Sequence, residues 1–470
     1  MSNKTAGEYS FRALLPVILT LAWPTMLDQL LQTAVQYIDT AMVGSLGTAA
    51  TAAVGSTTTV NWLVGSTVSA IGVGFLAYIS QARGAGLNEK ARQASAQAVL
   101  AVLTVGILFT AVTLSLAGVI PRLMQVEGEI AKDASLYFFI LYTPMLARTA
   151  SIIFGTVLRA AGDTKTPMLV GLAVNATNVV LNFLLIYPTR IWQVGRWEIF
   201  LPGAGLGVMG AAAASAIAFA VGGCLITVAL WRHPEVSPRG QSLRPNREVL
   251  LPCLRVAAPN ALQRFGTSLG YVVFAATVNS LGPIATAAHT IANTVESAFY
   301  VPGYGMQTAA ATLAGNALGA GDTKRLRALA RTVIAVEVTL MAVSGGLLFL
   351  LAPRAMLLFS KDAAVILLGA TVLRMVALSE PFYGVSIVVE GMMQGMGRTV
   401  MPLVTNLIGM WAIRIVGTLL CTQLWHMGLV SAWACMILHN LMLFFTFTPY
   451  FLLRLRRMRR NEGTVRRETT

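Results

Sequence analysis

The chain has 470 residues, of which 56% are hydrophobic and only 11% are charged, and its mean hydropathy is +0.70. A soluble domain carries about a quarter charged residues, so this chain has too few polar side chains to cover a water-facing surface. Hydrocarbon must therefore be the solvent for most of the protein. The net charge of +15 does not indicate nucleic-acid binding, because most basic residues lie in short segments between apolar runs.

Apolar segments longer than the roughly 20 residues that cross a bilayer recur along the chain. Because of their number and length, we expect an all-α integral membrane protein with twelve transmembrane helices. The expected spans are 13–43, 48–80, 94–120, 134–158, 166–188, 205–231, 250–281, 284–316, 329–352, 365–393, 401–424 and 427–453.

The basic residues predict the orientation of these spans. If the N-terminus is cytoplasmic, 24 of the 34 Lys and Arg fall in cytoplasmic segments, six in outer segments and four within spans. An excess of Lys and Arg in cytoplasmic loops sets membrane topology. We therefore expect a multi-pass inner (plasma) membrane protein with both termini in the cytoplasm.

The sequence contains an internal duplication at an offset of 235 residues. VGSLGTAATAA at 43–53 matches VNSLGPIATAA at 278–288, and the GAG at 84–86 matches the GAG at 319–321. Two repeats of six spans must share one orientation, related by a pseudo-two-fold axis along the membrane normal. The predicted domains are an N-lobe at 1–231, a cytoplasmic linker at 232–249, a C-lobe at 250–453 and a basic cytoplasmic tail at 454–470.

Several motifs occur in a specific order and at specific spacings. They are YIDTAMVGSLG around Asp39, RGAGLNEKAR at 83–92, LRAAGDTKTP at 158–167, NATNVVLNFLLIYP at 175–188 and GVMGAAAAS at 207–215. With them, nearly the whole chain resembles the multidrug and toxic compound extrusion (MATE) family.

The resemblance implies a V-shaped pair of six-helix bundles with a central cavity. It also implies efflux of organic cations or amphipathic drugs in exchange for H⁺ or Na⁺, by alternating access. It implies neither an enzyme nor a cofactor. We expect a monomer whose partners are small-molecule cargo and membrane lipid; the sequence leaves the cargo and the coupling ion open.

Asp39 is an acid inside the first expected span. A lone carboxylate in hydrocarbon costs several kcal/mol, so such a group faces a cavity or takes up a proton or cation. Asp28, Gln32 and Gln36 lie on the same helical stripe and are secondary candidates for cation coupling. The alternative is that the stripe only joins helices by hydrogen bonds.

The fifth expected span carries Asn175, Asn178 and Asn182 on one helix face. By the resemblance, Asn178, Asn182 and Ser215 match polar positions of the family, although part of the family has an aspartate where Asn182 stands. We predict a coupling site of Asp39, Asn178, Asn182 and Ser215, with Na⁺ ligands from the first three. Asn175 is a secondary candidate, and simple interhelical hydrogen bonding is the alternative.

The second half departs from the family pattern. No acid lies between Phe265 and Gly270, where some sodium-coupled members have a glutamate, and Tyr383 stands near the position of another acid. We therefore expect Glu380 and Glu390 as secondary coupling candidates. The alternative is that acids pair with Arg264, Arg374 and Arg414 in buried ion pairs that lock the lobe.

Cation-binding cavities use aromatic rings and adaptable methionines. The candidates for the substrate cavity are Tyr37, Trp62, Tyr300, Tyr304 and Met306. The four cysteines, Cys224, Cys253, Cys421 and Cys435, show no metal or redox spacing, and we expect them to be small apolar fillers.

The alternative function is a flippase for lipid-linked sugars or lipids, from the same broader exporter superfamily. The intramembrane arginines favour it, because such cavities are cationic. The acidic and amidic stripe around Asp39 instead favours cationic cargo. A membrane enzyme is not expected, since no convergent reactive motif occurs.

Overall fold

The computed structural model describes residues 9–119, 128–194 and 197–468. Residues 1–8 of the predicted N-lobe and 469–470 of the predicted tail lie outside the described part. The structure is helical apart from loops and one hairpin that the sequence did not predict. This hairpin pairs β1 (Pro188–Val194) with β2 (Trp197–Ala204) in antiparallel register between two helices.

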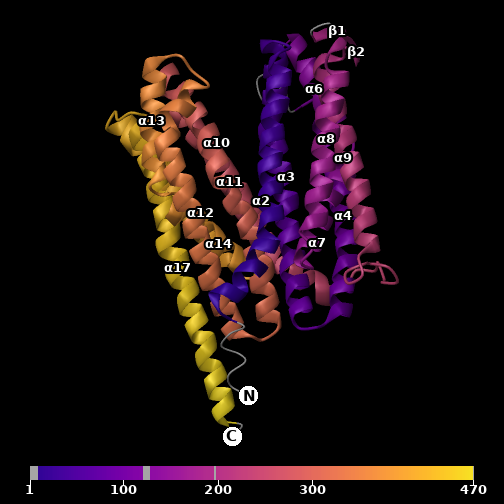
Figure 1. The fold of residues 1–470 in the computed structure, drawn as a ribbon, viewed down its shortest axis with the longest axis vertical. Coiled ribbons are helices and arrows are strands. Elements are labelled where there is room, and N and C mark those ends of the chain that lie inside the picture. The colour runs from indigo at the N-terminus through magenta and orange to yellow at the C-terminus, as the bar shows by residue number, and fades with distance from the viewer. Residues whose placement is uncertain (1–8, 120–127, 195–196, 469–470) are drawn as a thin grey trace. The chain divides into compact units, whose positions relative to one another are not determined.

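Long helices follow one another along the chain and run as extended rods (Figure 1). Those of the first half are α2 (Phe11–Gly44), α3 (Thr48–Gly84), α4 (Asn88–Leu116), α6 (Gly128–Tyr142), α7 (Met145–Ala160), α8 (Lys165–Leu185) and α9 (Gly207–Arg232). The helical elements of the second half, in which η marks a π-helix, are α10 (Arg247–Asn279), α11 (Pro283–Gly319), α12 (Thr323–Leu357), α13 (Ala363–Ala377), α14 (Glu380–Gly395), α15 (Val400–Ile408), η1 (Gly409–Ile415), α16 (Val416–Leu419), η2 (Leu420–Leu424) and α17 (Leu429–Glu468).

These helices account for the expected membrane spans. Within the described residues, eight helices are long and apolar enough to cross a membrane, and two bent helix pairs raise the number to ten. The long helices α10 and α11 coincide with the seventh and eighth expected spans. The chain is therefore a multi-pass membrane protein, as the composition predicted.

Two expected spans are broken rather than continuous. The helix bends by 50° between α6 and α7 and by 55° between α13 and α14. A proline ring removes one backbone donor and clashes with the preceding turn, so a new helix begins near it. Pro144 directly precedes α7, and Pro381 lies in the first turn of α14.

The duplication extends to the backbone. Helix α3 begins at residue 48 and α11 at residue 283, and the two breaks also recur 235 residues apart. Gly86 and Gly321, in the matched GAG turns, both have positive φ, at 73° and 66°. A side chain is strained in this conformation, which explains why both turns use glycine. The repeat inferred from sequence landmarks is thus a repeat of structure.

The chain divides into two compact units, each with parts of both α2 and α3. The C-unit comprises Met1–Gln29, Leu76–Leu87 and Pro252–Thr470, and the N-unit comprises Leu30–Phe75 and Asn88–Leu251. In the C-unit, α14 packs against α11, α12 and α17, around a core that includes Phe447 and Phe451. The lobe and linker boundaries expected from the sequence remain predictions.

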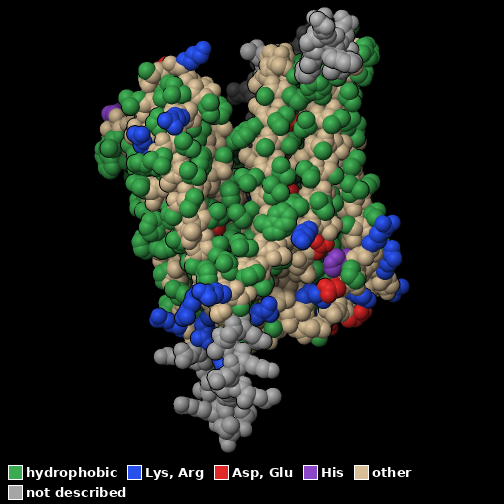
Figure 2. Space-filling view, viewed as in Figure 1, with side chains coloured by type: hydrophobic (Ala, Val, Ile, Leu, Met, Phe, Trp, Pro, Cys, Tyr) green, Lys and Arg blue, Asp and Glu red, His purple; other side chains and the backbone are tan. Residues whose placement is uncertain are grey.

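The outer surfaces of the helices are apolar. Leu350, Leu358 and Leu367 are 72%, 82% and 72% exposed, which in water would be unfavourable. Figure 2 shows hydrophobic side chains covering the long flanks of the helices, while Lys and Arg gather mainly near one end. This distribution fits helices whose flanks contact lipid tails.

Candidate functional site

A polar site lies within the N-unit, where three helices bring four side chains together. Asp39 lies half-buried on α2, Asn178 and Asn182 lie buried one turn apart on α8, and Ser215 lies half-buried on α9. The amide nitrogen of Asn182 donates to Asp39 Oδ1 at 2.5 Å and contacts Asn178 Oδ1 at 3.2 Å. The structure therefore brings together the four residues predicted as a coupling site; their role remains a prediction.

The orientation of the Asn178 amide determines what Asp39 encounters. In one orientation the Asn178 nitrogen donates to Ser215 Oγ at 3.0 Å. With the amide turned over, the nitrogen donates to Asp39 Oδ1 and Oδ2 at 2.8 and 3.2 Å, and the oxygen accepts from Ser215. The second orientation satisfies more polar atoms. One buried acceptor, Asn182 Oδ1, has no hydrogen-bond partner within the described residues.

The secondary candidates of the first half do not join this site. Asp28 is 3% exposed and belongs to the C-unit, and Gln32 and Gln36 are exposed on α2. The predicted stripe along α2 is therefore divided, since helix packing buries one end and leaves the middle open. Asn175 is half-buried on α8, and its buried Nδ2 makes no hydrogen bond to the described residues.

A tyrosine and an arginine extend the site in a way the sequence analysis missed. The buried Tyr137 of α6 interacts electrostatically with both Asp39 and Arg148. Arg148 donates to Asn61 Oδ1 at 2.6 Å, and its guanidinium lies 4.9 Å from the ring centre of Phe219. An arginine within a span is itself a rare signal, but only the fold reveals its neighbours.

The C-unit contains a second carboxylate held by amides. Glu390 Oε1 accepts from Gln263 at 2.8 Å and from Gln394 at 3.1 Å, and its Oε2 accepts from Asn406 at 3.4 Å. Three elements, α10, α14 and α15, supply these donors. Glu390 thus resembles Asp39 in accepting hydrogen bonds from amide side chains.

Two other acids in the C-unit have no such donors. Glu337 and Glu380 are 0% and 1% exposed, and none of their four carboxylate oxygens forms a hydrogen bond to the described residues. A Cβ atom at Gly303 or Gly384 would lie 2.9 or 2.8 Å from Glu337 Oε1. These glycines therefore make the space that the carboxylate occupies.

The alternative that buried ion pairs lock the second half is wrong for these two acids, because no polar group of the described residues reaches their oxygens. Arg374 is exposed, and its Nε lies 3.5 Å from the carbonyl oxygen of Phe349. Arg414 is buried, with its guanidinium 4.8 and 4.3 Å from the ring centres of Tyr271 and Phe274. Aromatic rings lie against the Arg414 guanidinium, and a backbone carbonyl group lies against Arg374.

The substrate-cavity candidates divide into three kinds. Tyr37 and Trp62 are 40% and 50% exposed in the N-unit. Tyr300 and Tyr304 form an aromatic cluster with Tyr383 in the C-unit. The ring centre of Tyr300 lies 5.9 Å from each of the other two rings, whose hydroxyl groups are 3.1 Å apart. Met306 is 1% exposed and packs in the core, because its helix turns this position inward.

Comparisons with known proteins decide the family. The sequence model of the MatE family matches residues 24–184 and again residues 259–420. The chain belongs to the MatE family. The two matches begin at the 235-residue offset of the duplication, so the resemblance to the multidrug and toxic compound extrusion family is confirmed.

Relatives and solved structures agree with this assignment. The chain is 27% identical over 420 residues to the probable multidrug resistance protein NorM of Thermotoga maritima, covering 89% of this chain and 88% of the relative. It is 26% identical to the multidrug resistance protein PmpM of Pseudomonas aeruginosa, covering 86% and 83%. A crystal structure of MATE in complex with MaL6 matches with a TM-score of 0.86 at 22% identity, covering 94% of this chain and 97% of that one. The expected all-helical transporter fold is therefore confirmed.

Proposed function

We propose that this MatE-family protein exports organic cations or amphipathic drugs in exchange for H⁺ or Na⁺, and that Asp39 couples the two movements. The observation that carries the proposal is a half-buried carboxylate on a membrane helix. Within the described residues, its hydrogen-bond partners are amide side chains and not basic ones. Such intramembrane acids mark ion pathways. The names of the relatives, which are multidrug resistance proteins, support a drug as cargo.

The four residues of the site can support two states of the carboxylate. With its nitrogen turned toward Asp39, Asn178 stabilises the ion-free carboxylate by donating to it. With its oxygen turned toward Asp39, Asn178 can join Asp39 and the unpartnered Asn182 Oδ1 as oxygen ligands for Na⁺. A proton would instead neutralise the carboxylate directly. Either ion removes the negative charge that attracts a cationic guest, which gives exchange its physical basis.

The remaining expectations form part of the same proposal. Glu380 and Glu390 are second coupling candidates. They differ in that Glu390 accepts hydrogen bonds, whereas Glu380 accepts none from the part of the chain that the structure describes. Tyr37, Trp62, Tyr300 and Tyr304 are candidates for contact with cationic cargo, since aromatic faces attract cations. We also propose location in the inner membrane as a monomer, with both termini cytoplasmic and the duplicated halves alternating access.

A flippase function receives less support. A solved MOP-superfamily transporter from Pyrococcus furiosus matches with a TM-score of 0.84 at 23% identity, and its binding pocket is described as having reverse polarity that suggests a different function. Arg414 faces aromatic rings, while the N-unit site has an acid among amides, which favours a cationic guest.

The test is ethidium efflux from vesicles that contain the purified protein, with pH and sodium gradients imposed separately. We expect the Asp39→Asn variant to lose gradient-driven efflux, because the amide can neither exchange a proton nor balance the charge of Na⁺. Asp133→Asn is the matched control, since it makes the same change at an exposed position on α6. Unchanged efflux by Asp39→Asn at equal protein content would reject Asp39 as the coupling group.

A further inference from the structure

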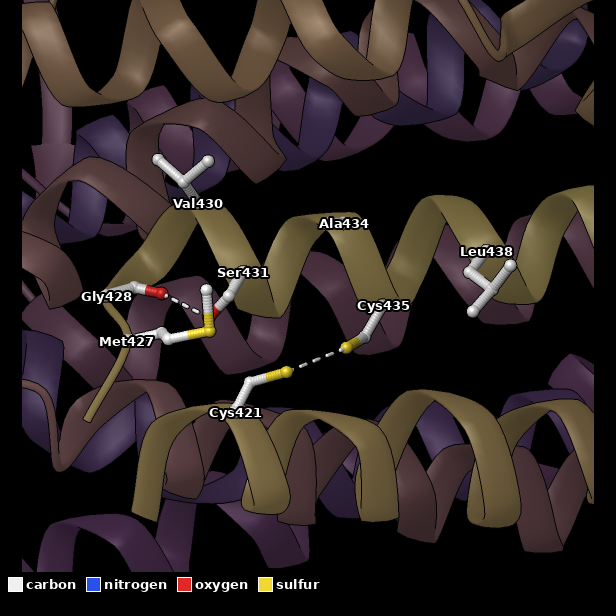
Figure 3. A pocket seen from close by; sticks show the side chains of 8 residues that line it. All are labelled: Cys421, Met427, Gly428, Val430, Ser431, Ala434, Cys435 and Leu438. Atoms are coloured by element: carbon white, nitrogen blue, oxygen red, sulfur yellow. Dashed lines mark hydrogen bonds between the residues drawn. The ribbon is translucent and has the colours of Figure 1, made fainter. Parts of the chain in front are cut away.

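Two cysteines that lie 14 residues apart in the sequence meet in the C-unit. Cys421 lies on η2 and Cys435 on α17, and their Sγ atoms are 4.0 Å apart across the connection between these elements (Figure 3). The sequence analysis expected the four cysteines to be small apolar fillers and did not predict that two of them are neighbours. Nothing in the coupling site uses these thiols, since its residues belong to the N-unit.

The surrounding elements hold the two thiols in place. A Cβ atom at Gly417, one turn before Cys421, would lie 3.1 Å from Cys435 Sγ, so α17 approaches this helix closely. Trp433 is fully buried and donates from Nε1 to His289 at 3.2 Å, which anchors the same turn of α17 on α11. The pairing of the thiols therefore follows from the packing of the helices.

A pocket beside the pair provides access for a reagent. It has a volume of about 420 Å³, and both cysteines line it together with Met427, Gly428, Val430, Ser431, Ala434 and Leu438. Its wall is almost entirely apolar. Cys421 is half-buried, whereas Cys435 is 9% exposed, so a small uncharged reagent would reach Cys421 first.

We propose that Cys421 and Cys435 form a dithiol modification site, which small apolar disulfides oxidise to an intramolecular disulfide that ties η2 to α17. A disulfide needs its sulfur atoms about 2.05 Å apart, so the 4.0 Å separation must close by rotation of the side chains between staggered rotamers. The charge distribution of the loops predicts that this connection faces the side of the membrane opposite the cytoplasm. Disulfides persist on that side, because it is the more oxidising compartment.

The reaction is thiol–disulfide exchange in two steps. The Cys421 thiolate attacks one sulfur of the reagent, its S–S bond breaks, and one reagent thiolate leaves. The Cys435 thiolate then attacks the Cys421 sulfur of the mixed disulfide and expels the second reagent thiolate. The protein loses two electrons and two protons, and the reagent gains both as two thiols.

The test uses 4,4′-dipyridyl disulfide, a small aromatic disulfide, on the purified full-length protein in lipid nanodiscs. We expect peptide mass spectrometry to show residues 421 and 435 joined by a disulfide, without a retained pyridyl group. Cys224 is an exposed lone cysteine, so it should retain a pyridyl mixed disulfide and act as an internal control. Dithiothreitol should reverse both modifications.

The Cys435→Ser variant provides a second measurement. Without the resolving thiol, Cys421 should retain the pyridyl group that the natural chain expels. A stable pyridyl adduct on Cys421 in the natural chain would overturn the proposal. So would an unreacted Cys421 in a sample whose Cys224 is fully modified.

Discussion

The half-buried Asp39 of the N-unit and the buried Glu337 and Glu380 of the C-unit differ in what surrounds them, although Glu390 of the C-unit has amide donors as Asp39 does. In the N-unit, the Asp39 carboxylate is a hydrogen-bond acceptor for the Asn182 amide, with Asn178 and Ser215 beside it. In the C-unit, the carboxylates of Glu337 and Glu380 are more deeply buried and have no hydrogen-bond donor in the described structure. The backbone is duplicated, but these polar groups are not.

The difference shows that a shared scaffold does not give a carboxylate a fixed role. Donors that point at a carboxylate stabilise its charged form, whereas an apolar surrounding stabilises its neutral form. Asp39 has an amide donor in Asn182, and this surrounding supports the proposal that Asp39 exchanges a bound ion. Glu337, enclosed by Gly303, Gly384 and Met341, has a surrounding that suits a neutral side chain.

Replacing each acid by an apolar residue of similar size should give opposite effects on stability. Glu337→Met removes an unsatisfied polar group, and we expect a gain in unfolding free energy of about 1–3 kcal/mol. Asp39→Leu leaves the Asn182 amide without its acceptor, and we expect a loss of about 1–3 kcal/mol. Denaturation of the purified variants in detergent measures both. A loss of stability in Glu337→Met would show that Glu337 has a partner, such as a bound cation.

The glycines around Glu337 provide a more local test. In Gly384→Ala, the new Cβ would lie 2.4 Å from Met341 Cγ and 2.8 Å from Glu337 Oε1, so we expect a loss of about 1–3 kcal/mol from overpacking. The matched control is Gly346→Ala, in α12, where a Cβ meets nothing within 4 Å. In thermal unfolding, we expect the melting temperature of the Gly346→Ala control to equal or exceed that of the natural chain. Equal unfolding of the two variants would contradict the close packing around Glu337.

The smallest effect concerns the matched turns outside the membrane, where Asp322 stands opposite Leu87 of the first half. Partial burial alone would raise the pKa of Asp322, but hydrogen bonds from the Tyr9 hydroxyl and the backbone of Arg325 outweigh it and lower the pKa below 3.8. A lowered pKa in the folded state stabilises the protein above the unfolded-state pKa. That contribution disappears as the pH falls through the folded-state value.

The measurement compares Asp322→Asn with the natural chain in melting experiments across acidic and neutral pH. Asparagine also caps a helix, so the variant removes the charge and keeps the cap at α12. We expect the natural chain to melt at a slightly higher temperature at neutral pH. The two curves should meet at the acid end; a constant difference across pH would mean that the charge contributes nothing.

The fold was more predictable than the sites. Hydrophobic length predicted the spans and the repeated glycine motifs predicted the duplication, because both signals can be found directly in the sequence. The bend before α14 was missed, since a proline also occurs within unbroken helices such as α11. The hairpin β1–β2 was missed because its residues lie within a connection that carries no membrane signal.

The sequence could nominate residues whose signal is local, but it could not predict contacts that depend on packing. Asn178 and Asn182 were found through their spacing on one face, and Asp39 through its rarity in an apolar run. No sequence rule predicts that Cys421 meets Cys435 or that Glu337 lacks a partner. Both depend on which neighbouring helix faces the side chain, and that is a property of the assembled unit.

The lengths of α3 and α11 have a practical consequence. Each has 37 residues and so extends about 55 Å, whereas the hydrocarbon layer is about 30 Å thick. The ends of these rods must reach past the acyl chains, which presents the turns at Gly86 and Gly321 on stiff helical stems. An antibody fragment raised against either turn would meet a preformed epitope, and its binding would carry little entropic cost for ordering the antigen.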